Sequence, residues 1–211
     1  TIANINAFAI GASLTDPEAK IHLTWTCLKG EHWREYISEN DIRVVSGPDL
    51  IRPKNEDNEY GLYTVGDGGE TERIAYPVWN WGKYYELIVQ TVLSGAWDAE
   101  SADAKNSAIN YWWGMSTGVI DIYQSDAIAH ETLKLISMMR KGITADIINP
   151  FEGELYSQEG LIKSALSPRL DNEQIINMDW LCSNVAGAIP TFDELTEPAK
   201  KAVLANGLPI I

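Results

Sequence analysis

The chain has 211 residues, of which 45% are hydrophobic and 22% are charged, a composition typical of folded globular domains rather than of disordered chains. Thirty acidic residues against sixteen basic ones give a formal net charge of -14, which would repel a polyphosphate backbone and argues against nucleic acid as a partner. No apolar run approaches the ~18–20 residues that cross a bilayer, no secretion signal opens the chain, and two cysteines are too few for a disulfide framework.

The first predicted elements include a strand–helix–strand unit. Helical spacing of apolar residues predicts a helix from the start of the chain to Asp16-Pro17, since proline disfavours helix at the residue before it. The alternating, β-branched segment 21–26 predicts a strand, residues 31–40 a helix and residues 42–46 a second strand. Strands joined by such a crossover are expected to pair in parallel.

A β-hairpin and a strongly amphipathic helix follow. Residues 59–65 and 73–79 flank a glycine-rich cluster at 66–69, which supplies the positive φ angles that tight hairpins need. The apolar positions of residues 82–94 fall on one stripe and Gly95 follows them, so a helix is predicted there. The later predicted elements are strands at 109–113 and 119–123, a helix at 127–141, a hairpin at 154–163, a helix at 171–185, and a last helix opened by the capping box Thr191–Glu194.

The sequence contains one formal catalytic motif. Residues 114–118 read Gly-Met-Ser-Thr-Gly, the G-x-S-x-G spacing that exposes a serine nucleophile at a strand-to-helix turn. The histidine that follows, His130, is too close to act from a later strand, and residues 119–122 predict a strand rather than a helix. The motif is therefore interpreted as a turn between strands, and a serine hydrolase using Ser116 remains the enzymatic alternative.

No metal site or cofactor is predicted. The three histidines, His22, His32 and His130, are dispersed and lack the spacing of a zinc-binding helix. With thirty acidic residues, close carboxylate pairs are expected by chance and indicate no catalytic site.

A ligand-binding site is the remaining hypothesis. Trp25 ends a predicted parallel strand, Asp49 lies in the loop after the next strand, and Trp79 and Asn80 lie at a strand-to-helix junction. In open α/β sheets, ligands gather at the carboxyl ends of strands. These three regions are expected to share one edge of the sheet.

Several short segments, in order along nearly the whole chain, resemble the basic membrane protein (BMP) family. That family comprises substrate-binding proteins of ABC transporters similar to purine nucleoside receptors. The segments that carry the resemblance are residues 6–12, Asp16-Pro17, Trp25-Thr26, residues 78–85 (Val-Trp-Asn-Trp-Gly-Lys-Tyr-Tyr), residues 113–115, residues 149–151 with Gly153, and residues 178–180.

The resemblance implies an α/β fold of the type I periplasmic-binding-protein class, with a largely parallel sheet flanked by helices and with hairpins. In that fold two lobes joined by hinge strands close on a ligand between them. Residues 1–211 would be the C-terminal portion, lacking most of the N-terminal lobe, with a hinge near residues 76–81. The helix at 82–95 would pack on the absent lobe, so self-association through its apolar stripe is expected.

The resemblance also implies a function. It predicts a non-catalytic component that binds a small molecule, for example a purine nucleoside, with an ABC transporter permease as partner and a lipid anchor outside these residues that places it in the cell envelope. The expected ligand-binding residues are Trp25, Asp49, Tyr63, Trp79 and Asn80.

Two departures from the family pattern argue against specificity for nucleosides. Cys27-Leu28-Lys29 stands where relatives carry an aromatic residue, and Gly61-Leu62-Tyr63 stands where they carry a ribose-binding Asp. The run at 108–116 resembles a branch of the family fused behind an unrelated domain. It leaves open a cytoplasmic, ligand-sensing regulatory domain of the same fold.

Overall fold

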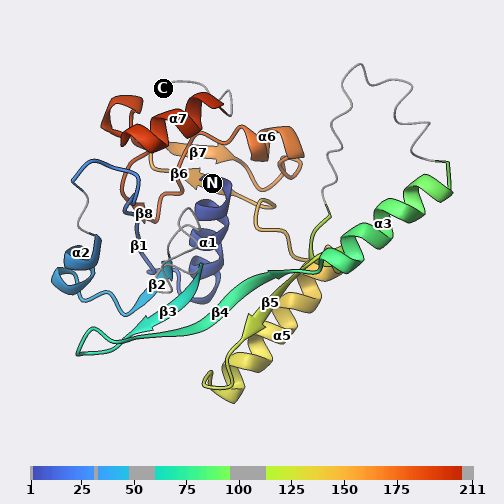
Figure 1. Ribbon diagram of the computed structural model, residues 1–211, viewed down its shortest axis with the longest axis horizontal. Helices are drawn as coiled ribbons and strands as arrows, with labels where there is room; N and C mark the ends of the chain where they lie inside the picture. Colours follow the sequence, from blue (N-terminus) through green and yellow to red (C-terminus); the bar gives the residue numbers. More distant parts are fainter. Residues whose placement is uncertain (1, 31–32, 48–59, 96–112, 206–211) are drawn as a thin grey trace. The chain divides into compact units, whose positions relative to one another are not determined.

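The computed structural model describes residues 2–30, 33–47, 60–95 and 113–205. The chain divides into two units (Figure 1): the first comprises residues 1–41 and 149–211, and the second comprises residues 42–148. Within the described ranges, helices and strands are both present, so the protein is of the mixed α/β class. None of the described helices combines the length and apolar character needed to cross a bilayer.

The first unit is built around helix α1 (Ile2–Thr15), which is apolar on nearly all sides and is therefore suited to burial. Ala9 on this helix packs against Leu181, Cys182 and Val185. A second cluster of Phe151, Leu155 and Met178 packs against other positions of the same helix. Residues from the last third of the chain thus cover one face of the N-terminal helix, whereas Phe8 and Leu14 on it are exposed.

The short parallel pair of the first unit joins the same distant parts of the chain. Strand β1 (Ile21–His22) pairs with β8 (Val185–Ala186) in parallel. Strands β6 (Leu155–Ser157) and β7 (Gly160–Lys163) form an antiparallel hairpin. The other elements of this unit are α2 (Trp33–Glu39), α6 (Asn172–Ile176), η3 (Phe192–Glu194) and α7 (Glu197–Ala205).

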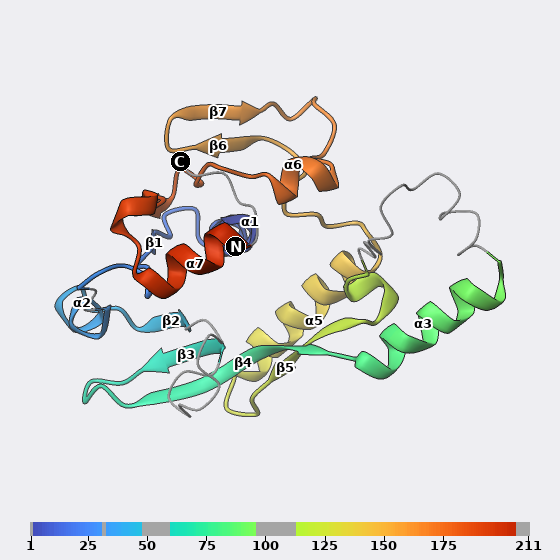
Figure 2. The ribbon, with the colours of Figure 1, turned by 45° about the horizontal axis from the view of Figure 1, so that its top comes forward.

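The second unit contains a four-stranded antiparallel sheet in the order β2-β3-β4-β5. Its strands are β2 (Val44–Gly47), β3 (Gly61–Val65), β4 (Thr71–Trp79) and β5 (Ile120–Gln124), and its helices are α3 (Trp81–Leu93), η2 (Met115–Thr117) and α5 (His130–Thr144). Helix α5 runs beside β5, and α3 continues outward from the end of β4 (Figure 2).

Most of the locally predicted elements are confirmed. Strands β3 and β4 form the expected hairpin, with Gly69 at a φ of +81° in its turn. Helix α3 ends before Gly95, which has a φ of +75° and donates its N–H to the carbonyl of Val92. The hairpin of β6 and β7 and the capping box at Thr191 are also as expected, although that box opens the short helix η3.

The prediction of a largely parallel sheet is wrong for the second unit. The strands predicted at 21–26 and 42–46 do not pair with each other, because β1 pairs with β8 whereas β2 pairs with β3. The hairpin of β3 and β4 extends the sheet by local antiparallel pairing, which needs only a short turn. The parallel pairing of β1 instead depends on residues more than 160 positions away.

The helix predicted at 171–185 is also wrong beyond its first residues, since α6 ends at Ile176. The backbone N–H of Cys182 donates to the Asn6 side chain at 2.9 Å, and Val185 pairs in β8. These contacts with α1 and β1 replace the intrahelical hydrogen bonds that the apolar spacing favoured.

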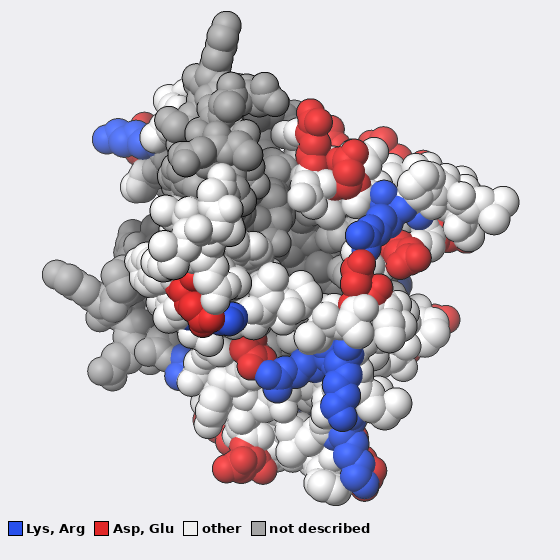
Figure 3. All heavy atoms as spheres, turned by 90° about the vertical axis from the view of Figure 1, so that its right-hand side faces the viewer, with Lys and Arg blue, Asp and Glu red and all other residues white. Residues whose placement is uncertain are grey.

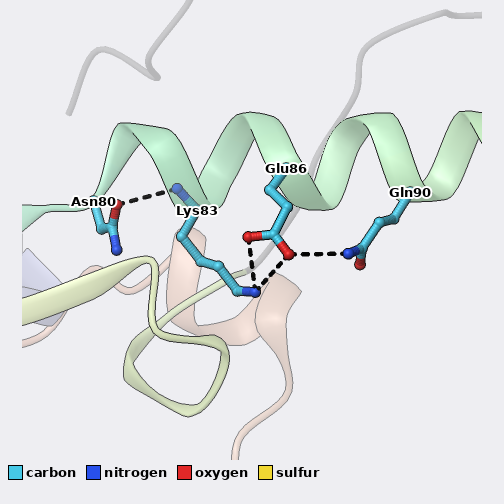
Figure 4. Close-up of polar contacts among 4 residues, drawn as sticks. All are labelled: Asn80, Lys83, Glu86 and Gln90. Atoms are coloured by element: carbon cyan, nitrogen blue, oxygen red, sulfur yellow. Dashed lines mark hydrogen bonds and ion pairs between the residues drawn. The ribbon is translucent and has the colours of Figure 1, made fainter.

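Helix α3 exposes its apolar stripe, and side chains on its polar face form hydrogen bonds with one another. Tyr85, Val89 and Leu93 are 61%, 54% and 81% exposed, which agrees with the expected uncovered stripe. On the polar face, Lys83 pairs with Glu86, and Gln90 donates to Glu86 (Figure 4). Self-association through the stripe stays a prediction.

Candidate functional site

A pocket of about 260 Å³ lies in the first unit, where β1 and β8 end. It is lined by Leu23, Thr24 and Trp25 after β1, by Ala188, Ile189 and Pro190 after β8, and by Leu28, Tyr36 and Glu194. The carboxyl ends of parallel strands bring two loops to the same edge, where α/β proteins commonly bind ligands. The pocket therefore occupies the kind of position predicted for Trp25.

The loop after β1 is fixed to the loop after β8 by hydrogen bonds. Leu23 donates its N–H to the carbonyl of Ala186 at 2.8 Å, which continues the parallel ladder past β1. Two residues later, the indole Nε1 of Trp25 donates to the carbonyl of Ala188 at 2.8 Å. This hydrogen bond fixes the position of the half-buried Trp25 ring in the pocket wall.

The close approach of the two loops requires a glycine. Gly187 has a φ of +147°, and a Cβ on it would lie 2.8 Å from the carbonyl oxygen of Leu23. The amide Nε2 of Gln158 donates to the carbonyls of Val185 and Gly187 at 2.8 Å each. Strand β8 is therefore held at its carboxyl end from both sides, so the pocket wall it leads into is preorganised.

Glu194 supplies a carboxylate to the pocket wall. Its Oε2 accepts hydrogen bonds from the backbone N–H of Thr191 at 2.7 Å and from the Thr191 hydroxyl at 2.8 Å. The backbone hydrogen bond, followed by the hydroxyl, holds the pKa of Glu194 below its ordinary value. The carboxylate is therefore ionised at neutral pH.

Tyr36 contributes the second polar group of the pocket with a fixed orientation. Its hydroxyl is 2.8 Å from Nδ1 of His22, and the two rings lie 5.9 Å apart. Tyr36 comes from α2 and His22 from β1, so the contact fixes this wall relative to the parallel pair. The pocket thus combines an indole ring and aliphatic walls with a few polar groups, the usual composition of a small-molecule site.

The second unit carries a separate group of aromatic side chains at the junction of β4 and α3. Trp79 and Trp81 are 47% and 58% exposed, and Tyr84 makes edge contacts with Trp81 and Trp113 at 5.9 and 5.6 Å. Asn80 is the N-cap of α3, since its Oδ1 accepts from the backbone N–H of Lys83 at 3.1 Å (Figure 4). The cap fixes the turn that presents both tryptophans.

The predicted site residues fall into distinct places. Trp25 lines the pocket of the first unit, whereas Trp79 and Asn80 are neighbours in the second unit. Tyr63 lies on β3 opposite Arg73, which precedes Trp79 by six positions, so about 20 Å of strand separates Tyr63 from Trp79. Asp49 lies outside the described residues.

Two pocket residues, Tyr36 and Glu194, were not anticipated from the sequence. The capping box at Thr191 marked Glu194 as a helix-start residue, but no local pattern indicated that it would line the same pocket as Trp25. The bridge that brings this segment back, Leu28 opposite Leu195, is non-local. The signal available in the sequence was therefore the capping box alone.

The G-x-S-x-G segment forms a turn that leads into a strand, as expected, whereas residues 109–112 of the strand predicted before it lie outside the described residues. Ser116 lies in the short helix η2, Gly118 follows with a φ of +74°, and the chain then enters β5. A nucleophile elbow would lead into a helix instead. Within the described ranges, no group of three or more His, Cys, Asp or Glu side chains is placed to hold a metal ion.

Acidic and basic side chains occur together on the described surface. Lys83 pairs with Glu86, Lys134 with Glu131, and Arg140 with Asp121. The face in Figure 3 likewise carries both signs of charge. These pairs neutralise part of the positive charge of a chain whose net charge is -14.

The chain is similar to proteins named as substrate-binding proteins. It is 22% identical over 205 residues to a purine-binding protein of Brucella abortus. The aligned region covers 90% of this chain and 55% of the relative. The chain is 23% identical over 174 residues to a Haloferax volcanii protein that carries the provisional name ABC transporter glucose-binding protein, covering 75% of this chain and 41% of the relative. The chain thus spans about half the length of these curated relatives, and no protein-family model matches it.

Proposed function

We propose that this chain is part of the ligand-binding component of an ABC-type uptake system, related to the basic membrane protein family, and that its ligand is a purine base or nucleoside. The observation that carries the proposal is the pocket at the carboxyl ends of β1 and β8, with the Trp25 ring held in its wall. The similarity to binding proteins along 90% and 75% of the chain supports a binding role rather than catalysis.

The lining of the pocket favours a flat aromatic ligand. A nucleobase can stack on the Trp25 indole, and aliphatic Leu23, Leu28 and Ile189 can contact its edges. The volume of about 260 Å³ is just below the ~300–1,000 Å³ typical of sites for drug-sized ligands. A small ring system therefore fits this site better than a large ligand does.

A purine fits the pocket better than a sugar does. A monosaccharide presents hydroxyl groups around its whole ring, and each one that is buried needs a polar partner. The lining offers only a few polar side chains, Thr24, Tyr36 and Glu194, among mostly apolar ones. The purine-binding relative is therefore the better guide to ligand class than the glucose-binding one.

The type I two-lobed arrangement and the location remain part of the proposal. The ligand-binding roles expected of Trp79 and Asn80 in the second unit stay a prediction. A receptor for uptake would be held outside the cytoplasmic membrane, and a regulatory module of the same fold would be cytoplasmic. Fractionation of cells that express the complete protein separates these locations, since a receptor should be found with the cell envelope.

Calorimetric titration of the protein with adenosine, inosine, adenine and glucose tests the ligand class. Purines should bind, and Trp25→Ala should weaken binding by about 5- to 150-fold, the range expected for loss of one base–aromatic stack of ~1–3 kcal/mol. Trp25→Phe is the matched control, because it keeps a ring and should retain most of the affinity. Binding of glucose but of no purine at millimolar concentration would overturn the proposal.

A second arm addresses the aromatic group of the second unit. Trp79→Ala tests the ligand-binding role expected of Trp79, and weaker purine binding would support that role. Equal affinity of Trp79→Ala and the native protein would remove Trp79 from the ligand-binding residues. Circular dichroism spectra of each variant establish whether the fold is retained.

A further inference from the structure

We propose that Glu194, held by Thr191, is the specificity-determining group of the pocket: it selects ligands that present N–H or O–H donors and rejects anionic, phosphorylated ligands. This inference rests on the proposed function, and it assigns a residue that the sequence did not indicate as a ligand-binding position. It depends on the way the carboxylate is anchored, on its surroundings and on the charge of the chain.

The anchoring of Glu194 leaves part of its acceptor capacity for a ligand. Both hydrogen bonds from Thr191 end on Oε2. A carboxylate offers about four lone-pair sites, so Oε1 can accept further donors. Because Thr191 restrains the side chain from two atoms, Glu194 loses little additional freedom when a ligand binds.

The Glu194 side chain is exposed, and its charge rather than its burial gives a hydrogen bond there its strength. Leu28, Ile189 and Pro190 line the same pocket, and a hydrogen bond to a charged group is stronger than one between neutral groups. Lys29 is close in sequence, but its Nζ donates to the carbonyl of Asp193 at 2.8 Å. Within the described ranges, no ion pair to Glu194 is found, so the carboxylate keeps its negative charge toward the pocket.

An uncompensated carboxylate also determines what the pocket excludes. A ligand phosphate near Glu194 would meet a like charge, and the net charge of -14 adds to the repulsion at long range. A purine that carries no ring N–H, amino or hydroxyl group could still stack on Trp25 but could not donate to Glu194. Both kinds of ligand are therefore expected to bind more weakly than a neutral purine with N–H groups.

The first test uses the native protein and needs no variant. Calorimetric titration should give at least tenfold weaker binding for adenosine monophosphate than for adenosine. It should also give at least tenfold weaker binding for caffeine, a purine without N–H donors, than for adenine. Equal affinities within either pair would overturn the corresponding half of the inference.

The second test uses Glu194→Gln with Asp193→Asn as its matched control. Both variants remove one negative charge from adjacent positions, but Glu194 lines the pocket whereas Asp193 does not, and the Asp193 side chain is 99% exposed. Glu194→Gln should weaken adenosine binding about tenfold or more and reduce the discrimination against adenosine monophosphate. Asp193→Asn should change neither value more than about twofold.

The outcomes separate this inference from the proposed function. If Trp25→Ala loses affinity while Glu194→Gln behaves like Asp193→Asn, purine binding stands and the assignment of Glu194 fails. If the native protein binds no purine, both are overturned. A gain in relative affinity for adenosine monophosphate in Glu194→Gln alone would support the inference directly.

Discussion

Replacing Asn6 by alanine should destabilise the first unit more than any ordinary surface substitution. Asn6 is fully buried on α1, and its Nδ2 donates to the carbonyl of Trp180 at 2.7 Å and contacts Sδ of Met178 at 3.1 Å. Its Oδ1 accepts from the backbone N–H of Cys182 at 2.9 Å. One side chain thus satisfies two backbone groups from a segment more than 170 positions away.

The expected loss is about 3–4 kcal/mol. Asn6→Ala removes two hydrogen bonds and leaves the N–H of Cys182 and the carbonyl of Trp180 without their partners, each at a cost of ~1–3 kcal/mol when buried. The cavity left by the lost amide adds to this. Asn40→Ala is the control, because Asn40 is exposed and its hydrogen bond to the carbonyl of Tyr36 lies within one helical turn. A change within ~0.5 kcal/mol is expected there.

Urea unfolding followed by circular dichroism gives the overall change in stability. Hydrogen exchange measured by mass spectrometry on peptides from residues 2–15 and 178–186 then locates it, because exchange reports the free energy of opening segment by segment. Faster exchange should appear in both peptides of Asn6→Ala. A loss below ~1 kcal/mol, or one no larger than in Asn40→Ala, would refute the view that the Asn6 side chain holds α1 to the segment at 180–182.

Three further predictions concern other parts of the molecule. Burial raises the pKa of the Cys182 thiol from 9.0 to about 11, so the folded state keeps a proton that the unfolded state loses. The contribution of this thiol to stability in urea should be complete below pH 9 and fall by about 1–2 kcal/mol as the pH rises toward 11, a dependence absent from Cys182→Ala. Gly187→Ala should lower stability by about 2–3 kcal/mol and weaken purine binding, since its Cβ would lie 2.8 Å from a carbonyl oxygen; unchanged thermal melting would contradict the close approach. If the stripe of α3 mediates self-association, light scattering should give a mass that rises with concentration, and Val89→Glu should abolish the rise; a constant monomer mass at high concentration would remove this prediction.

Elements determined by local sequence could be predicted. The stripe of α3 and Gly95 after it are contained within fifteen residues, and so are the glycines between β3 and β4. The turn around Ser116 is of the same kind, because its two glycines and the strand that follows are adjacent in sequence. In each case the residues that stabilise the element are the residues that form it.

The errors arise where distant residues decide the structure. The apolar spacing of 171–185 is compatible with a helix, but Leu181, Cys182 and Val185 contact Ala9 instead. The segment at 21–26 likewise has the composition of a strand, yet only Ile21–His22 finds a parallel partner. A sequence pattern describes which residues prefer burial, but it does not identify the element that buries them.

The residues of the candidate site show the same difference between positions set by local sequence and positions set by distant residues. Trp25 could be predicted because its position after a strand is a local property, and Trp79 and Asn80 could be placed at a strand-to-helix junction for the same reason. Glu194 could not, because its place in the same pocket as Trp25 depends on the pairing of β1 with β8 and on the bridge between Leu28 and Leu195. Tyr63 lies on β3 opposite Arg73 in the antiparallel register, and its ligand-binding role stays a prediction.

The pocket depends on the packing of α1. Asn6 holds Cys182, and the N–H of Val185 donates to the carbonyl of Cys182 where the chain enters β8. Strand β8 leads through Gly187 into Ala188, whose carbonyl accepts the Trp25 indole. The pocket wall that carries the Trp25 ring is therefore positioned by a series of hydrogen bonds that begins in the core. For this reason, core substitutions in α1 are expected to affect ligand binding as well as stability.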